Sequence, residues 1–428
     1  MGLSAALLLV FTLVSACEAY SISFPTSQAR RSVWQGTRIL KRFRPARHYL
    51  QPVRQANPWP MQPLFHPYQG SRQDLRPKAT ARDVKLTNHH DKFYSCPITI
   101  GTPEQEFNVA FDISSSITWV PSMHSPPAYR RMHVYKRFND ELSSTHSTNY
   151  THFDVNYDLA RAIGYRSQDS VTIAGLMITN QSFGEALLEP DLFRGMMIDG
   201  ILGLGLNNID EEEEPSVFDN MVSQGLVPAP VFSIYLNRYG SGSPDSVLTL
   251  GGANPEYCEE NFTFADVTEH HRWQFEIDKV QLSSGDGIFT SGRQAVIDSR
   301  TSFIVGPMRE VHVLNTQLGG KLFPGHPGLL SNSYVYKYKF DCSEVDDLPD
   351  VEFIVNGKKL SLSSRDYVVK TEEKGKSVCV SGIFGMKLKE KDEPDWSLGL
   401  NFMRAYYTQF DKGNRRIGFA RALSFPQT

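Results

Sequence analysis

The sequence lacks several features that would place the protein in a common class. Beyond residue 19 it has no apolar run long enough to cross a bilayer as a helix, so we expect no membrane span. Windows with helical patterning are few and short, at 215–224 and 307–318. The acidic run 210–214 has no neighbouring ligands to close a coordination sphere, and the glycines in 203–205 lack the third glycine of a dinucleotide loop. We therefore predict neither a metal nor a cofactor.

The N-terminal part of the chain has few acidic residues, and in the rest of the chain basic residues are fewer than acidic ones. Residues 1–82 hold 12 Lys or Arg and 2 acids, and residues 83–428 hold 32 Lys or Arg and 45 acids, so the two parts carry +10 and −13. Opposite fields favour contact between a basic leader and an acidic body at neutral pH, and protonation of carboxylates in acid weakens it. The basic stretch 30–54 also fits a solvated tail that binds polyanions. Nothing else points to nucleic acid, and we expect no such partner.

The N-terminus has the pattern of a secretory signal peptide, to which we assign residues 1–19. Residues 5–14 are apolar but too few to span a bilayer, and small residues follow at Ala16 and Ala19, where cleavage is expected. We therefore expect the mature protein to be secreted to the extracellular space, or delivered to an endosomal or lysosomal compartment through the secretory pathway.

Cysteine is scarce, with 5 residues in the chain. Loss of Cys17 with the signal peptide leaves an even number, as expected for a protein that forms disulfides outside the cytosol. Three Asn-x-Ser/Thr sequons suit the same route and predict glycosylation at Asn149, Asn180 and Asn261.

Strand patterns dominate from residue 84 onward. Residues 20–82 are rich in Pro, Arg and Gln, and we assign them to a basic propeptide or linker. Segments such as 107–111 and 170–173 lie between turns that contain Gly, Pro or Asn. Aromatic residues at 11%, together with clusters of Val, Ile and Thr, favour β-structure, and 428 residues are enough for two domains. The sequence therefore predicts a mainly β protein.

One pattern occurs twice. Residues 109–116 read Val-Ala-Phe-Asp-Ile-Ser-Ser-Ser, and residues 295–302 read Ala-Val-Ile-Asp-Ser-Arg-Thr-Ser. Each is followed roughly 90–100 residues later by apolar residues and a glycine, at 201–203 and 396–399. This repeat predicts two similar lobes related by a pseudo-twofold axis. Asp112 and Asp298 would then face each other where the lobes meet.

Two aspartates at the ends of buried strands have a defined chemistry. Burying an isolated carboxylate costs free energy, but two carboxyl groups that share one proton stabilise each other. The ionised acid activates a water, and the protonated acid donates to the scissile carbonyl. Neither a metal nor a covalent intermediate is needed. Asp112 and Asp298 are therefore the candidate catalytic residues.

Several short motifs stand in a fixed order along the chain: 100–105 (IGTPEQ), 111–112 (FD), 119–122 (WVPS), Tyr157, 199–205 (DGILGLG), 250–252 (LGG), 273–274 (WQ) and 417–420 (IGFA). On these motifs the chain resembles, from Val84 to Ala422, the pepsin and cathepsin D family of aspartic endopeptidases. The resemblance implies a bilobal pepsin-like fold with a cleft, an N-terminal lobe at 83–268 and a C-terminal lobe at 269–428. It also implies Tyr157 on the flap, Trp119 in the cleft, a peptide or protein substrate or ligand, and a monomer.

The resemblance further implies a disulfide between Cys342 and Cys379. Cys96 and Cys258 remain, and they are not a usual pair in the family. We predict that these two form a second bridge, with two free buried thiols as the alternative.

Both active-site motifs depart from the family pattern Asp-Thr/Ser-Gly-Thr/Ser. The first reads Asp112-Ile113-Ser114-Ser115 and the second Asp298-Ser299-Arg300-Thr301. In the family the residue after each Asp sends a hydroxyl into the opposite lobe. Ser299 can do so and Ile113 cannot, which loosens the geometry of the dyad. Ser114 adds a side chain to a crowded turn, whereas Ser115 and Thr301 retain hydroxyls that support the acids.

Arg300 is the most serious departure. Its guanidinium is always charged and, if it points inward, would favour the ionised form of Asp298, so that both acids ionise and the proton donor is lost. If it points outward, the turn still differs from the glycine form. The flap changes too, because residues 158–160 replace the Gly-Thr-Gly that usually follows Tyr157, and Leu400 replaces an acidic residue.

Two hypotheses follow, and the sequence leaves open whether the protein is an enzyme. The first is a catalytically impaired or inactive homologue that binds peptide or protein ligands through the interlobe cleft or its surface. The second is a working acid endopeptidase that uses Asp112, Asp298 and an activated water. The changes at Ile113, Ser114 and Arg300 favour the first.

Overall fold

The structure is a computed structural model that describes part of the chain. The described residues are 80–127, 136–157, 161–189, 193, 196–206, 214–240, 245–285, 287–323, 335–373, 375–386 and 394–423. The predicted signal peptide, nearly all of the predicted propeptide and the flap residues 158–160 lie outside these ranges.

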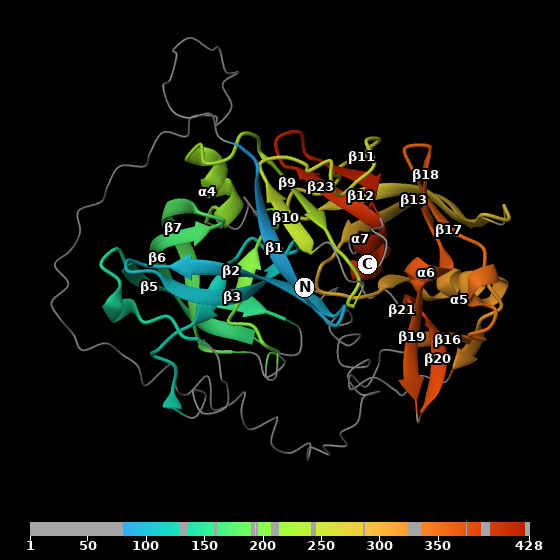
Figure 1. The fold of residues 1–428 in the computed structure, drawn as a ribbon, viewed down its shortest axis with the longest axis horizontal. Helices are drawn as coiled ribbons and strands as arrows, with labels where there is room; N and C mark the ends of the chain where they lie inside the picture. The colour runs from blue at the N-terminus through green and yellow to red at the C-terminus, as the bar shows by residue number, and fades with distance from the viewer. Residues whose placement is uncertain are drawn as a thin grey trace, which may run out of the picture. The chain divides into compact units, whose positions relative to one another are not determined.

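The mainly β architecture predicted from the sequence is confirmed (Figure 1). Thirteen of the described strands form one sheet, in the order β11 (Thr263–Asp266), β24 (Arg416–Arg421), β23 (Tyr406–Asp411), β9 (Val231–Tyr235), β10 (Ser246–Leu250), β1 (Arg82–His89), β2 (Phe93–Ile100), β3 (Gln105–Asp112), β8 (Ile201–Gly203), β4 (Trp119–Pro121), β7 (Leu176–Leu188), β6 (Arg161–Ile173) and β5 (Ser147–Asn156).

A second sheet contains eleven described strands. Its order is β18 (Lys358–Leu362), β17 (Val351–Val355), β12 (Gln274–Leu282), β13 (Gly287–Ile297), β22 (Trp396–Leu398), β14 (Ile304–Pro307), β21 (Ile383–Met386), β16 (Val335–Phe340), β20 (Lys376–Ser381) and β19 (Val368–Glu373), and β15 (Lys321–Phe323) pairs with β16. In Figure 1 this sheet takes up the orange and red side, and the blue and green strands belong to the first sheet. The final strands β23 and β24 are the exception, because they pair in the first sheet.

Helices are short in the described part of the chain. They are α4 (Val217–Ser223), α5 (Met308–Gln317), α6 (Ser364–Tyr367) and α7 (Leu400–Ala405), with 3-10 turns at η1 (Asp140–Leu142) and η4 (Val345–Asp347). The two predicted helical windows correspond to α4 and α5. A capping box begins α4, where the Ser216 hydroxyl accepts from the Asp219 backbone and Asp219 accepts from the Ser216 backbone. Pro307 stands one position before the first residue of α5.

The sequence repeat is a structural repeat. In the first sheet β3 runs parallel to β8, with Asp112 opposite Gly203, and in the second sheet β13 runs parallel to β22, with Ile297 opposite Leu398. Each pair is then extended by an antiparallel strand, β4 beside β8 and β14 beside β22. The apolar residues before each Asp are buried in these strands. Both halves therefore place an aspartate at the same point, the end of a central strand.

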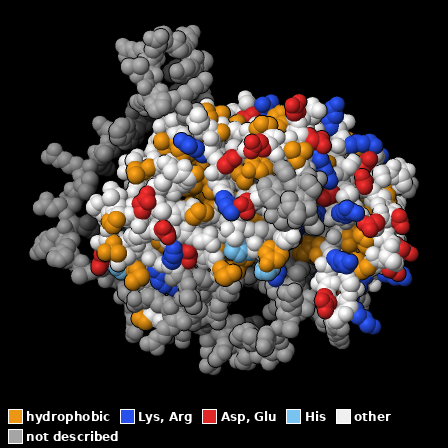
Figure 2. All heavy atoms as spheres, in the orientation of Figure 1, with side chains coloured by type: hydrophobic (Ala, Val, Ile, Leu, Met, Phe, Trp, Pro, Cys, Tyr) orange, Lys and Arg blue, Asp and Glu red, His pale blue; other side chains and the backbone are white. Residues whose placement is uncertain are grey.

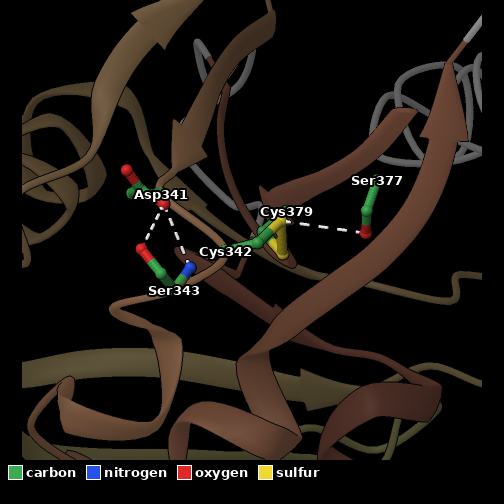
Figure 3. Close-up of a disulfide and its surroundings, with 5 residues drawn as sticks. All are labelled: Asp341, Cys342, Ser343, Ser377 and Cys379. Atoms are coloured by element: carbon green, nitrogen blue, oxygen red, sulfur yellow. Dashed lines mark hydrogen bonds between the residues drawn. A yellow bond between two sulfur atoms is a disulfide. The ribbon is translucent and has the colours of Figure 1, made fainter.

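Only one of the two predicted disulfides is present. Cys342 and Cys379 are bonded across a sequence separation of 37 residues (Figure 3). The predicted bridge between Cys96 and Cys258 is wrong, since both are buried free thiols. Cys96 packs among apolar side chains of the first sheet, where burial raises its pKa to about 12. It therefore behaves as a small hydrophobic residue.

Charged side chains of both signs lie on the described surface. On the face drawn in Figure 2, acidic and basic side chains are interspersed over the described residues. The three sequon asparagines, Asn149, Asn180 and Asn261, are all exposed. Within the described ranges no helix is long and apolar enough to cross a membrane.

Candidate active site

The two predicted aspartates come from the ends of matching strands. Asp112 is the last residue of β3 and Asp298 follows β13, and they are only 2% and 1% exposed. Direct contacts join the two motifs: the backbone N–H of Ile113 donates to the Ser299 hydroxyl at 3.1 Å, and the Ser114 hydroxyl donates to Asp298 Oδ1 at 3.1 Å. The structure therefore brings the two halves of the repeat together at the acids.

One of the two cross-lobe hydroxyl contacts remains. The Ser299 hydroxyl accepts from Ile113 and donates to the backbone carbonyl of Phe111 at 3.4 Å. The Ile113 side chain has no polar atom and belongs to the apolar core, with 1% exposure. At this position the second motif contributes hydrogen bonds through Ser299, whereas Ile113 of the first motif contributes apolar packing through its side chain.

Ser114 does more than crowd the turn. Its backbone N–H donates to Asp112 Oδ1 at 2.8 Å while its hydroxyl donates to Asp298 Oδ1. Hydrogen bonding from Ser114 lowers the pKa of Asp112, against the larger effect of burial. Ser114 therefore contacts both carboxyl groups, Asp112 through its backbone N–H and Asp298 through its hydroxyl. Sequence patterns did not point to this contact, because it depends on how closely the opposite motif approaches.

Arg300 points inward. Its Nε donates to Asp298 Oδ1 at 3.1 Å, its Nη2 donates to Asp298 Oδ2 at 3.3 Å, and its backbone N–H donates to Oδ1 at 2.9 Å. The side chain of Arg300 is 22% exposed and that of Asp298 is 1% exposed. This two-pronged contact has the geometry of a charge-assisted ion pair and holds the Asp298 side chain in one orientation.

Asp112 is in the opposite situation. Burial raises its pKa, and the charge of Asp298 raises it further, against the lowering effect of Arg300 and of the Ser114 hydrogen bonds. Its Oδ2 is buried without a hydrogen-bond partner among the described residues. Contrary to the expectation that Arg300 leaves both acids ionised, Asp112 keeps a proton to higher pH than an ordinary aspartate.

The remaining hydroxyl residues hold the two turns. Ser115 accepts from the backbone of Ile117 at 3.2 Å, and Thr301 accepts from the backbone of Phe303 at 3.3 Å. The carbonyl of Thr301 also accepts from the backbone of Leu400, which is fully buried at the start of α7. These groups support the backbone next to the acids and do not contact the carboxyl groups themselves.

Tyr157, the expected flap tyrosine, is held by contacts with Trp119 and Phe193. The Tyr157 hydroxyl accepts from Trp119 Nε1 at 2.6 Å, and Phe193 packs edge-on against both rings. All three side chains are buried, and burial raises the pKa of Tyr157. The sequence identified Tyr157 and Trp119, whereas Phe193 stands outside any pattern that would have marked it.

A cavity of about 60 Å³ lies against Asp112. Most of its lining is apolar, including Phe93, Phe111, Tyr157, Phe193, Met196 and Ile198, and its polar residues are Asp112, Ser299 and Arg300. The cavity offers the Asp112 carboxyl group, whose pKa is raised by burial, beside an apolar wall and the Arg300–Asp298 ion pair. Nowhere in the described ranges do His, Cys, Asp and Glu gather in a group able to hold a metal.

The chain is similar to known proteins over most of its length. The family model described as Eukaryotic aspartyl protease matches residues 93–422. Cathepsin D of Gallus gallus is 36% identical over 339 residues, which cover 79% of this chain and 83% of the relative. Cathepsin D of Clupea harengus is 37% identical over 339 residues, and that of Chionodraco hamatus is 38% identical over 338, with the same coverage of both chains. The chain therefore belongs to the eukaryotic aspartyl protease family.

Proposed function

We propose that this protein is a secretory-pathway member of the aspartyl protease family that binds peptide or protein ligands at the cleft and hydrolyses them poorly or not at all. The observation that carries the proposal is the hydroxyl of Ser114 between Asp112 and Asp298. Hydrolysis by a carboxylate pair needs a water in contact with an ionised acid. Here a side chain of the protein takes that contact.

Neither acid is available as a base. Asp298 Oδ1 accepts three donors, from the Ser114 hydroxyl and from two nitrogens of Arg300, which exceeds its two lone pairs. Asp298 Oδ2 accepts a further guanidinium nitrogen. Asp112 has a raised pKa and is protonated over a wider pH range. A water that reached this site would find Asp298 Oδ1 already occupied by three donors and Oδ2 engaged by the guanidinium.

Ligand binding is supported by what remains. The protonated Asp112 can donate to a carbonyl oxygen, and the cavity beside it accepts an apolar group. The Tyr157–Trp119 hydrogen bond keeps the base of the flap in place over this region. A peptide segment with an apolar side chain next to a carbonyl matches these groups.

The test compares the natural protein with a restored dyad. The triple variant Ile113→Thr, Ser114→Gly, Arg300→Gly removes the changes in both motifs, and adding Asp112→Asn to it gives an inactive control of the same background. We expect no cleavage of denatured protein by the natural chain from pH 3 to 7, and pepstatin-sensitive cleavage by the triple variant that disappears in the control. Cleavage by the natural chain that pepstatin blocks and Asp112→Asn removes would refute the proposal.

The second candidate is an acid endopeptidase of low activity. It is favoured by the retained pair of acids and by the Tyr157–Trp119 anchor. The same assay separates the two, because this candidate predicts slow cleavage by the natural chain and a further gain on restoration.

The route through the cell is part of the proposal. A signal peptide at 1–19, removal of a basic propeptide at 20–82 and glycans on Asn149, Asn180 and Asn261 would place the mature monomer outside the cell or in an endosomal or lysosomal compartment. The Cys342–Cys379 bridge and the exposure of all three asparagines support it. Mass spectrometry of protein recovered from the medium and from lysosomes, before and after deglycosylation, tests each step.

A further inference from the structure

A second cavity lies in the first sheet, and it shares no lining residue with the cavity at Asp112. Its volume is about 240 Å³, and every residue that lines it has a hydrogen-bonding side chain, among them Ser147, Thr148, Asn149, Gln168, Ser182 and Glu214. About eight waters would fill such a volume at the density of the liquid. A space of this size and polarity suits a polyhydroxylated ring and excludes an apolar ligand.

The strand register places a glycosylation sequon at the edge of this cavity. Thr148 pairs with Ser167 and the next pair is His152 with Tyr165, so residues 149–151 stand opposite a single residue of β6. This bulge is the sequon Asn149-Tyr150-Thr151. Bulges of this kind push the extra residues out of the sheet. Asn149 is exposed to solvent and also lines the cavity.

The bulge has the geometry of an Asx turn. Asn149 Oδ1 accepts from the Thr151 backbone at 3.0 Å and from the Thr151 hydroxyl at 2.7 Å. Tyr150 has a φ of 57° and its backbone donates to the Thr148 hydroxyl at 3.0 Å. The asparagine oxygen is thereby held by its own sequon, and the amide nitrogen is the atom left for modification.

The far side of the cavity has a polar atom in need of a partner. Glu214 lines the cavity, and its side chain is 40% exposed. Its Oε2 has no hydrogen-bond partner among the described residues, and its Oε1 lies 3.9 Å from Arg166 Nη1. An acceptor without a partner is destabilising, and a donor that enters the cavity offsets part of that cost. Sugar hydroxyls are such donors.

We propose that Asn149 carries an N-linked glycan whose first sugar folds back into this cavity and donates a hydroxyl to Glu214. The modification transfers an oligosaccharide from a lipid-linked diphosphate donor. A bond forms between the first sugar carbon and Asn149 Nδ2, the bond from that carbon to the phosphate oxygen breaks, and the amide proton is released. The cavity then takes the sugar that is closest to the protein.

Asn261 provides a matched control within the same chain. It is also exposed and in a sequon, but it does not line this cavity. The full chain is produced in a glycosylating host, and an endoglycosidase trims each glycan to a single sugar. We expect Asn149→Gln to lower the Tm of the trimmed protein by about 2–4 °C, the size of one or two net hydrogen bonds. Asn261→Gln should leave the Tm unchanged.

A double-mutant cycle tests the contact with Glu214. Glu214→Ala removes the acceptor and leaves every sequon intact, so mass spectrometry should find the sugar still on Asn149. We expect Glu214→Ala to lower the Tm of glycosylated protein that retains Asn149, and to leave the Tm unchanged in protein that carries Asn149→Gln. Hydrogen exchange of β5 and β6 amides should be slower in trimmed protein than in Asn149→Gln.

Two results would overturn the inference. One is mass spectrometry that finds Asn149 unmodified in protein with a modified Asn261. The other is a modified Asn149 for which Asn149→Gln changes the Tm and the hydrogen exchange no more than Asn261→Gln does, while the effects of Asn149→Gln and Glu214→Ala on the Tm are additive. That result would place the sugar in solvent. The inference rests on the glycan at Asn149 that the proposed route includes, so the first result would also remove that step of the route. Neither result bears on ligand binding or cleavage at the acids, so this inference and the proposed activity fail separately.

Discussion

Replacing Ser114 by glycine should lower stability and raise the affinity for a hydroxyl-bearing inhibitor at the same time. The Ser114 hydroxyl donates to Asp298 Oδ1 at 3.1 Å, and a hydrogen bond to a charged group contributes about 1.5–3 kcal/mol to the free energy of unfolding. Glycine adds a backbone entropy cost of about 0.5–1 kcal/mol. Ser114→Gly should therefore lose about 2–4 kcal/mol of unfolding free energy in urea titrations.

The same substitution clears the space between the acids. Pepstatin is a peptide inhibitor with a hydroxyl that mimics the attacked carbonyl, and transition-state analogues gain affinity where such groups are accommodated. We expect its Kd to fall at least about tenfold, equivalent to about 1.4 kcal/mol, in calorimetric titrations at pH 5. Ser114→Ala, which lacks the hydroxyl but keeps the Cβ, should show part of this gain with a smaller loss of stability.

Ser115 offers the negative control. Its hydroxyl accepts from the Ile117 backbone and does not contact the acids, so Ser115→Ala should leave pepstatin affinity unchanged. If a folded Ser114→Gly protein binds pepstatin no better than Ser115→Ala does, the hydroxyl of Ser114 does not occupy the position that matters, and the reasoning is wrong.

Three further predictions concern stability. Burial raises the pKa of Asp112 above its ordinary value of 3.8, so its stabilising effect is full below that pH and is lost as pH rises toward the folded pKa. Asp112→Asn should therefore flatten the fall in unfolding free energy as pH rises above about 4, and an unchanged slope in urea titrations would contradict this. Tyr157→Phe removes the 2.6 Å hydrogen bond to Trp119 and should cost about 0.5–1.5 kcal/mol with a shift in tryptophan emission. Cys342→Ser opens the bridge to Cys379 and should cost about 2–4 kcal/mol; an equal urea midpoint in reduced and oxidised natural protein would argue against that.

The repeat in the sequence was enough to predict two matching halves whose aspartates meet. Three apolar residues before each Asp fill a central strand, and the apolar residues and glycine that follow much later supply its parallel neighbour. The apolar runs are continuous because these strands are buried on both faces, so each run marks a central strand and the Asp at its end. For this reason Asp112 and Asp298 were found without a structure.

Side-chain directions at the site were beyond such patterns. The contact of Ser114 with Asp298 joins segments 184 residues apart in the chain. The inward direction of Arg300 depends on the rotamer of a single side chain. The raised pKa of Asp112 reflects the depth of burial, which the sequence does not give. The predicted pairing of Cys96 with Cys258 was wrong for a related reason, since an even number of cysteines says nothing about the distance between any two of them.

The return of the last strands to the first sheet has a consequence for how the protein is made. β23 pairs with β9, and β24 closes the row between β23 and β11. While the ribosome is still producing the second half, β9 therefore has an open edge, which is a site for unwanted pairing with other chains. The first half must wait in this incomplete state until nearly the whole polypeptide has emerged. Contacts that span so much of the chain form slowly, so a chain cut short before Tyr406 should aggregate even though most of its core residues are present.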